Sequence, residues 1–292
     1  MAKGPMQWSK AMEDLYLEEV HRKVQYDRRT DWEEGKNISL GYPFKVIFEE
    51  VLEKGRADFT NGHQDDEYGA LTAEDKVLLY CFVCMKRHFY EALATFRAYK
   101  TRLKPLFESG IPSVLADLGC GPGTAGMALG ECLDQPRVVY AGLDIAAAMR
   151  SKAKSMLIAA MDNSVLHAKS QISVTSSWTQ LAKVPATINK PMNVLLNATY
   201  LFSSASLNVD DVCGTVMAIK QSAHVRRLLF VYCNTTTDIS GEKFRQFKNR
   251  LRGEFSSDGL MTCEREYHKR RGSDATSKTE FVRQLLVFED DK

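Results

Sequence analysis

The sequence predicts an α/β protein in which a mostly parallel sheet follows an N-terminal helical region. Residues 1–110 carry apolar side chains at helical spacing, whereas beyond Pro112 short apolar runs alternate with helical segments. A dense glycine cluster, GCGPG at 119–123, stands between the first of these runs and the helix that follows it. Strands that alternate with helices are joined by right-handed crossovers, so they predict a parallel sheet covered on both faces.

The N-terminal region is predicted to contain three helical segments. Apolar residues recur at helical spacing over 15–24 and again over 44–52. Thr72 has the character of an N-cap, with Asp75 three positions further on, and predicts the start of a helix over 73–100. That third segment is rich in aromatic side chains, so we expect it to pack on another part of the chain.

Beyond Pro112 the pattern predicts seven strands, of which the last two form an antiparallel hairpin at the sheet edge. The strands are expected at 114–118, 138–143, 171–175, 192–197, 228–233, 261–267 and 281–288. We therefore divide the chain into a helical extension, residues 1–110, and a sheet domain, residues 111–292. The extension is expected to cover the substrate side of the sheet, or to mediate association with a protein partner or a second copy.

Composition excludes several classes of function. The 292 residues carry a formal net charge of +2, so the whole molecule lacks the strong positive field of many nucleic-acid binders. No apolar run approaches the roughly 20 residues of a membrane span, and the first residues lack the apolar core of a signal peptide. Seven cysteines, an odd number without a framework spacing, suit a reducing compartment. These features predict a cytoplasmic protein without a membrane partner.

The glycine cluster has the features of a cofactor cradle. Glycine lets the backbone approach a ligand closely, and the helix that follows presents free N–H groups to negative charge. A phosphate-binding loop is excluded because Pro122-Gly123-Thr124 supplies no lysine. A dinucleotide fingerprint is poorly matched, since Thr124 stands where the third glycine belongs, which disfavours a nucleotide-cofactor oxidoreductase.

The stretch DLGCGPG at 117–123 resembles the acid-x-Gly-x-Gly-x-Gly signature of class I S-adenosylmethionine (SAM) dependent methyltransferases. The resemblance extends over roughly 112–290 and implies a Rossmann-like, doubly wound, seven-stranded sheet with a reversed edge hairpin. It also implies that SAM is the cofactor, with its methionine part near Gly119 and Gly121 and its amino group oriented by Asp117. The cofactor-binding residues predicted in this way are Asp117, Gly119, Cys120, Gly121, Gly123, Asp144, Ile145, Ser177, Trp178 and Asn197.

Two further positions bear on the nucleoside part of the cofactor. Asp144 ends the second predicted strand, where the resemblance implies a carboxylate that accepts from the ribose hydroxyls; it is also a reasonable N-cap for the next helix. Family members often place an acid after the third strand for the adenine amino group, but this chain has Ser176-Ser177-Trp178 there. Ser177 is suited to hydrogen-bond the adenine ring and Trp178 to stack on it, although Trp178 is equally suited to the core.

The acceptor is expected beyond the fourth strand, where Asn197 and Tyr200 are the predicted catalytic residues. Asn-x-x-Tyr has the two ends of the Asn-Pro-Pro-Tyr motif that family members use for nitrogen acceptors, but both prolines are missing. The alternative is a strand end whose Tyr200 packs inward. Asn234, after the fifth strand, is a weaker candidate at the same edge. Cys81 and Cys84 form a CxxC within a helix without further ligand pairs, so we predict buried thiols and no metal.

Basic clusters are the only indication of the acceptor class. They comprise Lys243, Arg245, Lys248, Arg250 and Arg252 on or near one predicted helix, and Lys269, Arg270 and Arg271 in the loop between the last two strands. Such clusters favour RNA or DNA slightly over protein or a small molecule, although a solvated helix face and a loop would look the same. The sequence therefore predicts a SAM-dependent methyltransferase with a nitrogen on RNA or DNA as acceptor. The alternative is a non-catalytic SAM-fold subunit that acts as an interaction module.

Overall fold

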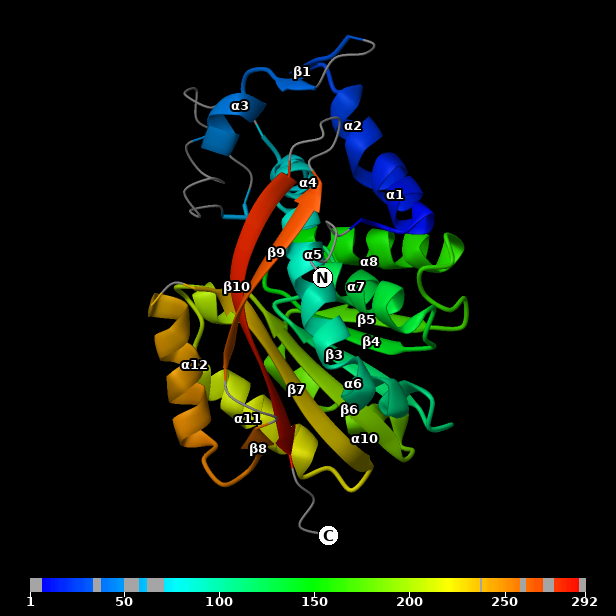
Figure 1. Ribbon diagram of the computed structural model, residues 1–292, viewed down its shortest axis with the longest axis vertical. Coiled ribbons are helices and arrows are strands. Elements are labelled where there is room, and N and C mark those ends of the chain that lie inside the picture. The colour runs from blue at the N-terminus through cyan, green and yellow to red at the C-terminus, as the bar shows by residue number, and fades with distance from the viewer. Residues whose placement is uncertain are drawn as a thin grey trace.

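A computed structural model of the protein describes residues 7–33, 38–49, 58–61, 71–236, 238–257, 261–269 and 276–288. The central sheet of these residues has eight strands in the order β5-β4-β3-β6-β7-β10-β8, with β9 paired to β10 (Figure 1). The strands are β3 Ser113–Leu118, β4 Val139–Leu143, β5 Gln171–Thr175, β6 Met192–Thr199, β7 Val225–Thr235, β8 Ser256–Ser257, β9 Thr262–Lys269 and β10 Thr276–Phe288. Strands β3 to β7 pair in parallel, whereas β10 runs antiparallel to β7, β8 and β9.

This topology confirms the predicted fold class, a mostly parallel and doubly wound sheet with an antiparallel hairpin. All seven predicted strands are present, and β8 is an addition of two residues. Two residues are too few to leave an alternating pattern in a sequence, so β8 could not be predicted. The strand order reverses beside β3, since the chain first builds outward through β4 and β5 and then returns to place β6 on the other side. In sheets of this kind ligands bind at the carboxyl ends of the strands next to the reversal.

Helices cover both faces of the sheet, each with its own hydrophobic cluster. On one face, Leu115 and Tyr140 of the sheet join a cluster with side chains from α5, α7 and α8. On the other face, Leu118 and Phe230 join a cluster with side chains from α11 and α12. The helices of the sheet region are α7 Thr124–Leu133, α8 Ala147–Asp162, α9 Trp178–Ala182, α10 Val184–Ile188, α11 Val209–Lys220 and α12 Asp238–Arg250. The short helices α9 and α10 are absent from the sequence prediction.

The predicted helix over 73–100 is divided in the structure. It forms α4 Ala73–Val83 and α5 Met85–Ala98, and α6 Lys100–Phe107 continues beyond it. The predicted capping box is confirmed, because Asp75 N–H donates to Thr72 Oγ1 at 3.1 Å and Thr72 N–H donates to Asp75 Oδ2 at 3.0 Å. Helix α5 packs against α7 and lies over the sheet beside β7, β9 and β10 (Figure 1).

The first helices of the chain pack against α4 and α8. Helix α1 Lys10–Tyr16 continues through a π-helical turn, Leu17–His21, into α2 Arg22–Gln25. A two-stranded sheet of β1 Thr30–Asp31 and β2 Ser39–Leu40 follows, and then α3 Phe44–Ile47. Neither small strand was predicted. The last residues of the second predicted helix, from residue 50 onward, lie outside the described residues.

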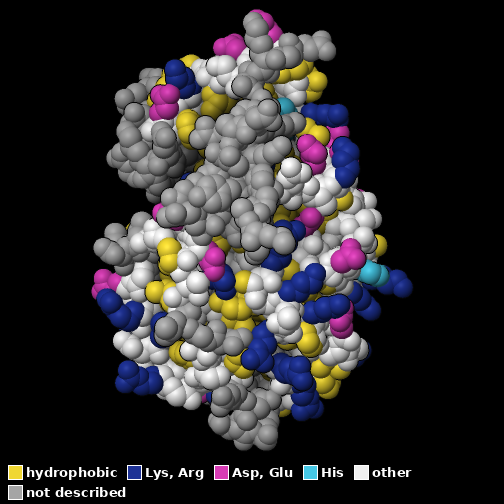
Figure 2. Space-filling view, viewed as in Figure 1, with side chains coloured by type: hydrophobic (Ala, Val, Ile, Leu, Met, Phe, Trp, Pro, Cys, Tyr) yellow, Lys and Arg dark blue, Asp and Glu magenta, His cyan; other side chains and the backbone are white. Residues whose placement is uncertain are grey.

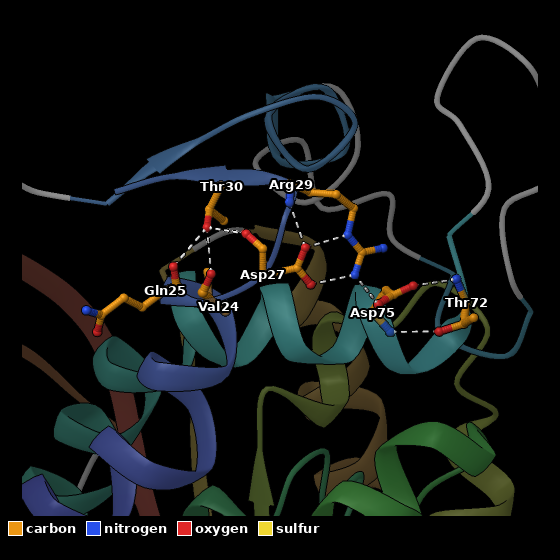
Figure 3. A network of polar contacts seen from close by, with 7 residues as sticks. All are labelled: Val24, Gln25, Asp27, Arg29, Thr30, Thr72 and Asp75. Carbon is orange, nitrogen blue, oxygen red and sulfur yellow. Dashed lines mark hydrogen bonds and ion pairs between the residues drawn. The ribbon is translucent and has the colours of Figure 1, made fainter. Parts of the chain in front are cut away.

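Arg29 joins the segment after α2 to the start of α4 (Figure 3). Its guanidinium donates to both carboxylate oxygens of Asp27, at 2.8 and 2.7 Å, and to Asp75 Oδ1 at 2.6 Å. The same Asp75 caps α4 with Thr72, so a single carboxylate serves both the helix start and the ion pair. The bidentate pair with Asp27 orients the guanidinium, and we infer that its contact with Asp75 then fixes α4 relative to the N-terminal segment.

Within the described residues, no helix is both long and apolar enough to cross a membrane.

Candidate functional site

The glycine loop adopts the backbone conformation that its sequence predicts. Strand β3 is buried along its whole length, and after it Gly119, Gly121 and Gly123 have φ values of 71°, 49° and 79°. These values lie in the left-handed region, which side chains with a Cβ rarely adopt. The N–H of Cys120 donates to Leu143 O at 2.8 Å, so the loop is joined to the end of β4. The loop therefore places its backbone at the carboxyl ends of two neighbouring strands.

A cavity of about 730 Å³ opens at this edge of the sheet. That volume lies within the roughly 300–1,000 Å³ that small-molecule and cofactor sites occupy. Eight of the predicted site residues line it, namely Asp117, Gly119, Cys120, Gly121, Asp144, Ile145, Trp178 and Tyr200. Three predicted residues, Gly123, Ser177 and Asn197, are not among the residues that line it.

Asp144 binds the glycine loop directly. Gly121 N–H donates to Asp144 Oδ2 at 3.0 Å, and Ala146 N–H donates to Oδ1 at 2.9 Å. A carboxylate oxygen can accept two hydrogen bonds, and each oxygen of Asp144 accepts one from the backbone. The carboxylate can therefore accept further hydrogen bonds from a ligand in the cavity. Burial raises the pKa of Asp144. The contact with Ala146 shows that the predicted capping role and a ligand-binding role are compatible.

Ile145 and Trp178 give the same end of the cavity an apolar surface. The Ile145 side chain is 65% exposed, although it stands beside a buried strand end. Arg150 holds this turn, because Nη1 donates to the backbone oxygens of Asp144 and Ile145 at 2.9 and 2.8 Å. Trp178 is half-buried at the start of α9, where it lines the cavity and also packs against the hydrophobic cluster. Ser177 caps α9, with its Oγ accepting from Gln180 N–H at 3.3 Å.

Asp117 is a buried carboxyl with two side-chain donors. Tyr140 Oη donates to its Oδ2 at 2.6 Å and Asn197 Nδ2 donates to its Oδ1 at 2.8 Å. Burial raises the pKa of Asp117 to about 6, and the two hydrogen bonds oppose that rise. The structure therefore places Asn197 behind Asp117, where its amide orients the carboxyl, whereas the sequence motif had suggested a position against the acceptor.

The opposite wall of the cavity comes from the N-terminal helices, where no site residue is predicted from the sequence. Tyr80 of α4 and His88 and Ala92 of α5 line the cavity, together with Tyr200 from the turn after β6. The Tyr80 hydroxyl and His88 Nδ1 lie 2.8 Å apart. The His88 and Tyr200 rings lie 4.2 Å apart between centroids, at an interplanar angle of 32°. Helical periodicity predicted that this segment packs, but not that it reaches the cavity.

A buried carboxyl holds Tyr200 in place. Tyr200 has a φ of 63°, which is uncommon for an aromatic residue. Its hydroxyl donates to Glu91 Oε2, and the Thr279 hydroxyl donates to Glu91 Oε1. Glu91 is 1% exposed, and burial raises its pKa. The Tyr200 hydroxyl thus points inward to Glu91, as the alternative interpretation predicted, but the residue also lines the cavity.

Among the residues that the structure describes, the charges that line the cavity are of one sign. Four aspartates line it, Asp58, Asp117, Asp144 and Asp211, and no lysine or arginine does so among the described residues. The cavity therefore favours neutral or cationic ligands over anionic ones. Within the described residues no group of three or more His, Cys, Asp and Glu side chains is arranged to hold a metal ion. Burial raises the pKa of Cys81 to about 12, so this thiol of the CxxC remains protonated.

The basic residues on α12 are mostly bound to other parts of the protein. Lys243 Nζ donates to the backbone oxygens of Ser204 and Ala205 at 2.5 and 2.9 Å. Lys248 Nζ donates to Gln284 Oε1 at 3.1 Å, and Arg250 pairs with Asp210 at 3.0 Å. In the second predicted cluster, Arg270, Arg271 and the side chain of Lys269 lie outside the described residues. A different group of Lys and Arg side chains gathers over α6, where Lys100, Arg102 and Lys104 are exposed (Figure 2).

Comparison with solved structures finds methyltransferases. The magnesium protoporphyrin IX methyltransferase of Synechocystis PCC 6803 with bound SAM is 12% identical; the match covers 87% of this chain and 100% of that one, with a TM-score of 0.39. Precorrin-6y C5,15-methyltransferase of Geobacter metallireducens GS-15 is 9% identical over 69% of this chain and 87% of its own, with a TM-score of 0.39. The plantazolicin methyltransferase in complex with S-adenosylhomocysteine is 12% identical over 71% and 86%, with a TM-score of 0.39. No model of a known protein family and no curated protein sequence matches the chain.

At these identities the assignment of the fold rests on the chain's own topology. The sheet order, the antiparallel β10 and the glycine loop after β3 agree with the Rossmann-like, doubly wound sheet that the resemblance implied.

Proposed function

We propose that this protein is a SAM-dependent methyltransferase. One observation carries the proposal: the left-handed glycine loop and the Asp144 carboxylate, joined at 3.0 Å through Gly121 N–H, line the same cavity at the carboxyl edge of a parallel sheet. A nucleoside ribose has two adjacent hydroxyl donors, which a carboxylate in this position is suited to accept. The aspartates that line the cavity also suit a ligand that carries positive charge.

The residues present fit the proposed cofactor. A Cβ on Gly121 would meet no atom within 4 Å, so a ligand can approach the backbone of Gly121 from the side where a Cβ would point. Asp117 would face the amino group of the methionine part, and Asp144 would accept from the ribose. Ile145 and Trp178 would supply apolar contacts to the adenine ring. When bound, SAM would supply a methyl group activated by its sulfonium.

The chain's own residues then have to align the acceptor. A methyl transfer of this kind is an in-line displacement, in which alignment of the nucleophile is the main contribution of the enzyme. Tyr200 lines the cavity and is positioned by Glu91, so its ring is available to the acceptor. Asn197 would act through Asp117 as a positioning residue. A nitrogen acceptor with a loosely held proton needs no strong base in this arrangement.

The predicted nucleic-acid acceptor has less support than the cofactor. It depends on the basic clusters, and three of the four basic residues of the first cluster that lie on α12 are bound to other parts of the protein. RNA or DNA as acceptor stays a prediction, as does association through the N-terminal helices. Incubation with SAM labelled in its methyl group and fractionated RNA, DNA, protein and metabolites tests the acceptor class. Label confined to metabolites or protein would overturn the nucleic-acid prediction.

Calorimetry with S-adenosylhomocysteine tests the cofactor assignment. We expect the wild-type protein to bind it and Asp144→Ala to bind roughly 10- to 100-fold more weakly, because hydrogen bonds to a charged group contribute about 1.5–3 kcal/mol each. Asp162→Ala is the matched control, since Asp162 is exposed at the end of α8, and it should bind like wild type. No binding by the wild-type protein at millimolar ligand would refute the proposal. Binding without turnover on any acceptor would favour the non-catalytic alternative.

A further inference from the structure

The wall of the cavity formed by Tyr80, His88 and Tyr200 is left unused by the cofactor site described above. These three side chains come from α4, from α5 and from the turn after β6, and all of them line the cavity. Phe59 lines the cavity beside them, with its ring 5.3 Å from that of Tyr80. We refer to Tyr80, His88 and Tyr200 as the aromatic wall.

The hydrogen bonds of His88 determine where its proton lies. Arg87 Nη2 is 3.3 Å from His88 Nε2, and a guanidinium only donates, so Nε2 accepts. Burial and the Arg87 charge lower the pKa of His88 to about 3, so the ring is neutral at physiological pH. A neutral imidazole carries one proton, which must then lie on Nδ1, and Nδ1–H donates to the Tyr80 oxygen at 2.8 Å.

This assignment leaves the Tyr80 hydroxyl proton available. Tyr80 accepts from His88 and therefore does not donate to it, while burial raises its pKa so that the hydroxyl remains protonated. Tyr80 is one of the residues that line the cavity, so a ligand bound there is a suitable acceptor for its O–H. Tyr200 differs, because its hydroxyl donates to Glu91 and leaves only its ring for contact. The aromatic wall thus offers ring surface and one hydrogen-bond donor.

The negative charge of the described lining residues restricts the classes of ligand that the cavity can bind. With four aspartates and no lysine or arginine among its described lining residues, the cavity would repel a phosphate or a carboxylate. Aromatic side chains attract planar rings through stacking and edge contacts. A neutral ring with a hydrogen-bond acceptor can stack on the aromatic wall and accept from the Tyr80 hydroxyl. Because it carries no negative charge, the aspartates do not repel it.

We propose that the aromatic wall is the acceptor site of the enzyme and that it binds an uncharged heteroaromatic ring whose heteroatom accepts from the Tyr80 hydroxyl. This inference rests on the proposed methyltransferase function, since it assigns the second ligand of the same cavity. It makes Tyr80 a specificity residue, because a ring without an acceptor atom leaves the Tyr80 donor without a partner.

Three small probes test the proposal on protein saturated with S-adenosylhomocysteine. Quinoline has a ring acceptor, naphthalene has the same shape without one, and quinoline-4-carboxylate adds a negative charge. Ligand-observed NMR should show that quinoline binds roughly three- to tenfold more tightly than naphthalene, the factor expected for one hydrogen bond. The carboxylate should bind more weakly than quinoline. Tyr80→Phe should reduce quinoline binding to the level of naphthalene and leave naphthalene unchanged.

The control is Tyr26→Phe, since the Tyr26 side chain is 70% exposed and is not among the residues that line the cavity. It should leave all three affinities unchanged. Equal binding of quinoline and naphthalene to the wild-type protein, or tighter binding of the carboxylate, would overturn the proposal even if Tyr80→Phe failed to fold. S-adenosylhomocysteine binding is measured separately. Its absence would count against the methyltransferase function, whereas its presence without the expected order of probes would count against this acceptor site alone.

Discussion

The raised pKa of Asp117 predicts that cofactor affinity depends on pH. Burial raises this pKa to about 6 from an ordinary value of 3.8. The carboxyl is therefore about one-tenth ionised at pH 5 and about nine-tenths ionised at pH 7. If the ligand's ammonium group binds only the ionised form, the apparent affinity scales with that fraction. S-adenosylhomocysteine should then bind about tenfold more tightly at pH 7 than at pH 5.

In the protein without ligand, the contribution of Asp117 to stability should decrease as the pH rises, whereas the affinity for the ligand increases. Its Asp117 keeps a proton between about pH 4 and 6, whereas the unfolded chain releases it, so the folded state binds more protons in this range. The contribution of Asp117 to the free energy of unfolding is therefore highest at low pH, and it falls as the pH rises through the folded-state pKa, by up to about 1.4 kcal/mol per pH unit. Urea unfolding at several pH values measures this decrease.

Calorimetry from pH 5 to 7, with wild type and two variants, tests the argument. Asp117→Asn cannot ionise, so its affinity should lose the tenfold dependence and its stability should lose the matching decrease. Asp144→Asn serves as the control because burial also raises the pKa of Asp144. This variant should bind more weakly at every pH but keep the dependence that Asp117 causes. If Asp117→Asn retained the wild-type pH dependence, the reasoning about this carboxyl would be refuted.

Two further predictions concern the packing around the site. Gly126→Ala should reduce the free energy of unfolding by about 1–3 kcal/mol in urea titrations, because a Cβ would lie 2.7 Å from the Tyr140 ring and 2.8 Å from Leu157 Cδ2; unchanged stability would show that these side chains move aside freely. Burial raises the pKa of Glu91 in the folded state only, so the free energy of unfolding of the wild type should fall as the pH rises above the ordinary pKa of a glutamate. Glu91→Gln cannot ionise and should lose this decrease. An identical pH profile of stability in this variant would contradict that assignment.

The local part of the site could be predicted from sequence because it depends on neighbouring residues. Gly119, Gly121 and Gly123 are needed where the backbone takes positive φ values, and a strand followed by this loop and a helix fixes their location. Asp144 could be predicted for a similar reason, since the end of the next parallel strand must lie beside the loop. The contact between Asp144 and Gly121 follows from that topology.

The role of Asn197 could not be predicted in the same way. Its sequence motif suggested contact with the acceptor, but β3 and β6 are adjacent and Asp117 is paired in register with Asn197. The buried carboxyl needs donors, and the amide beside it supplies one. Strand register, which no local pattern near Asn197 records, therefore decided which group its side chain would contact.

The sequence by itself determined the fold class, the glycine loop and the acid at the end of β4, because each depends on short-range pattern or on the order of strands and helices. Only the tertiary structure decided the opposite wall. Tyr200 meets Glu91 across 109 residues of sequence, and Glu91 meets Thr279 across 188. Most of α5 is buried, so its apolar pattern does not indicate which side chains face the cavity. The packing of α4 and α5 against the sheet brings Tyr80 and His88 to the site.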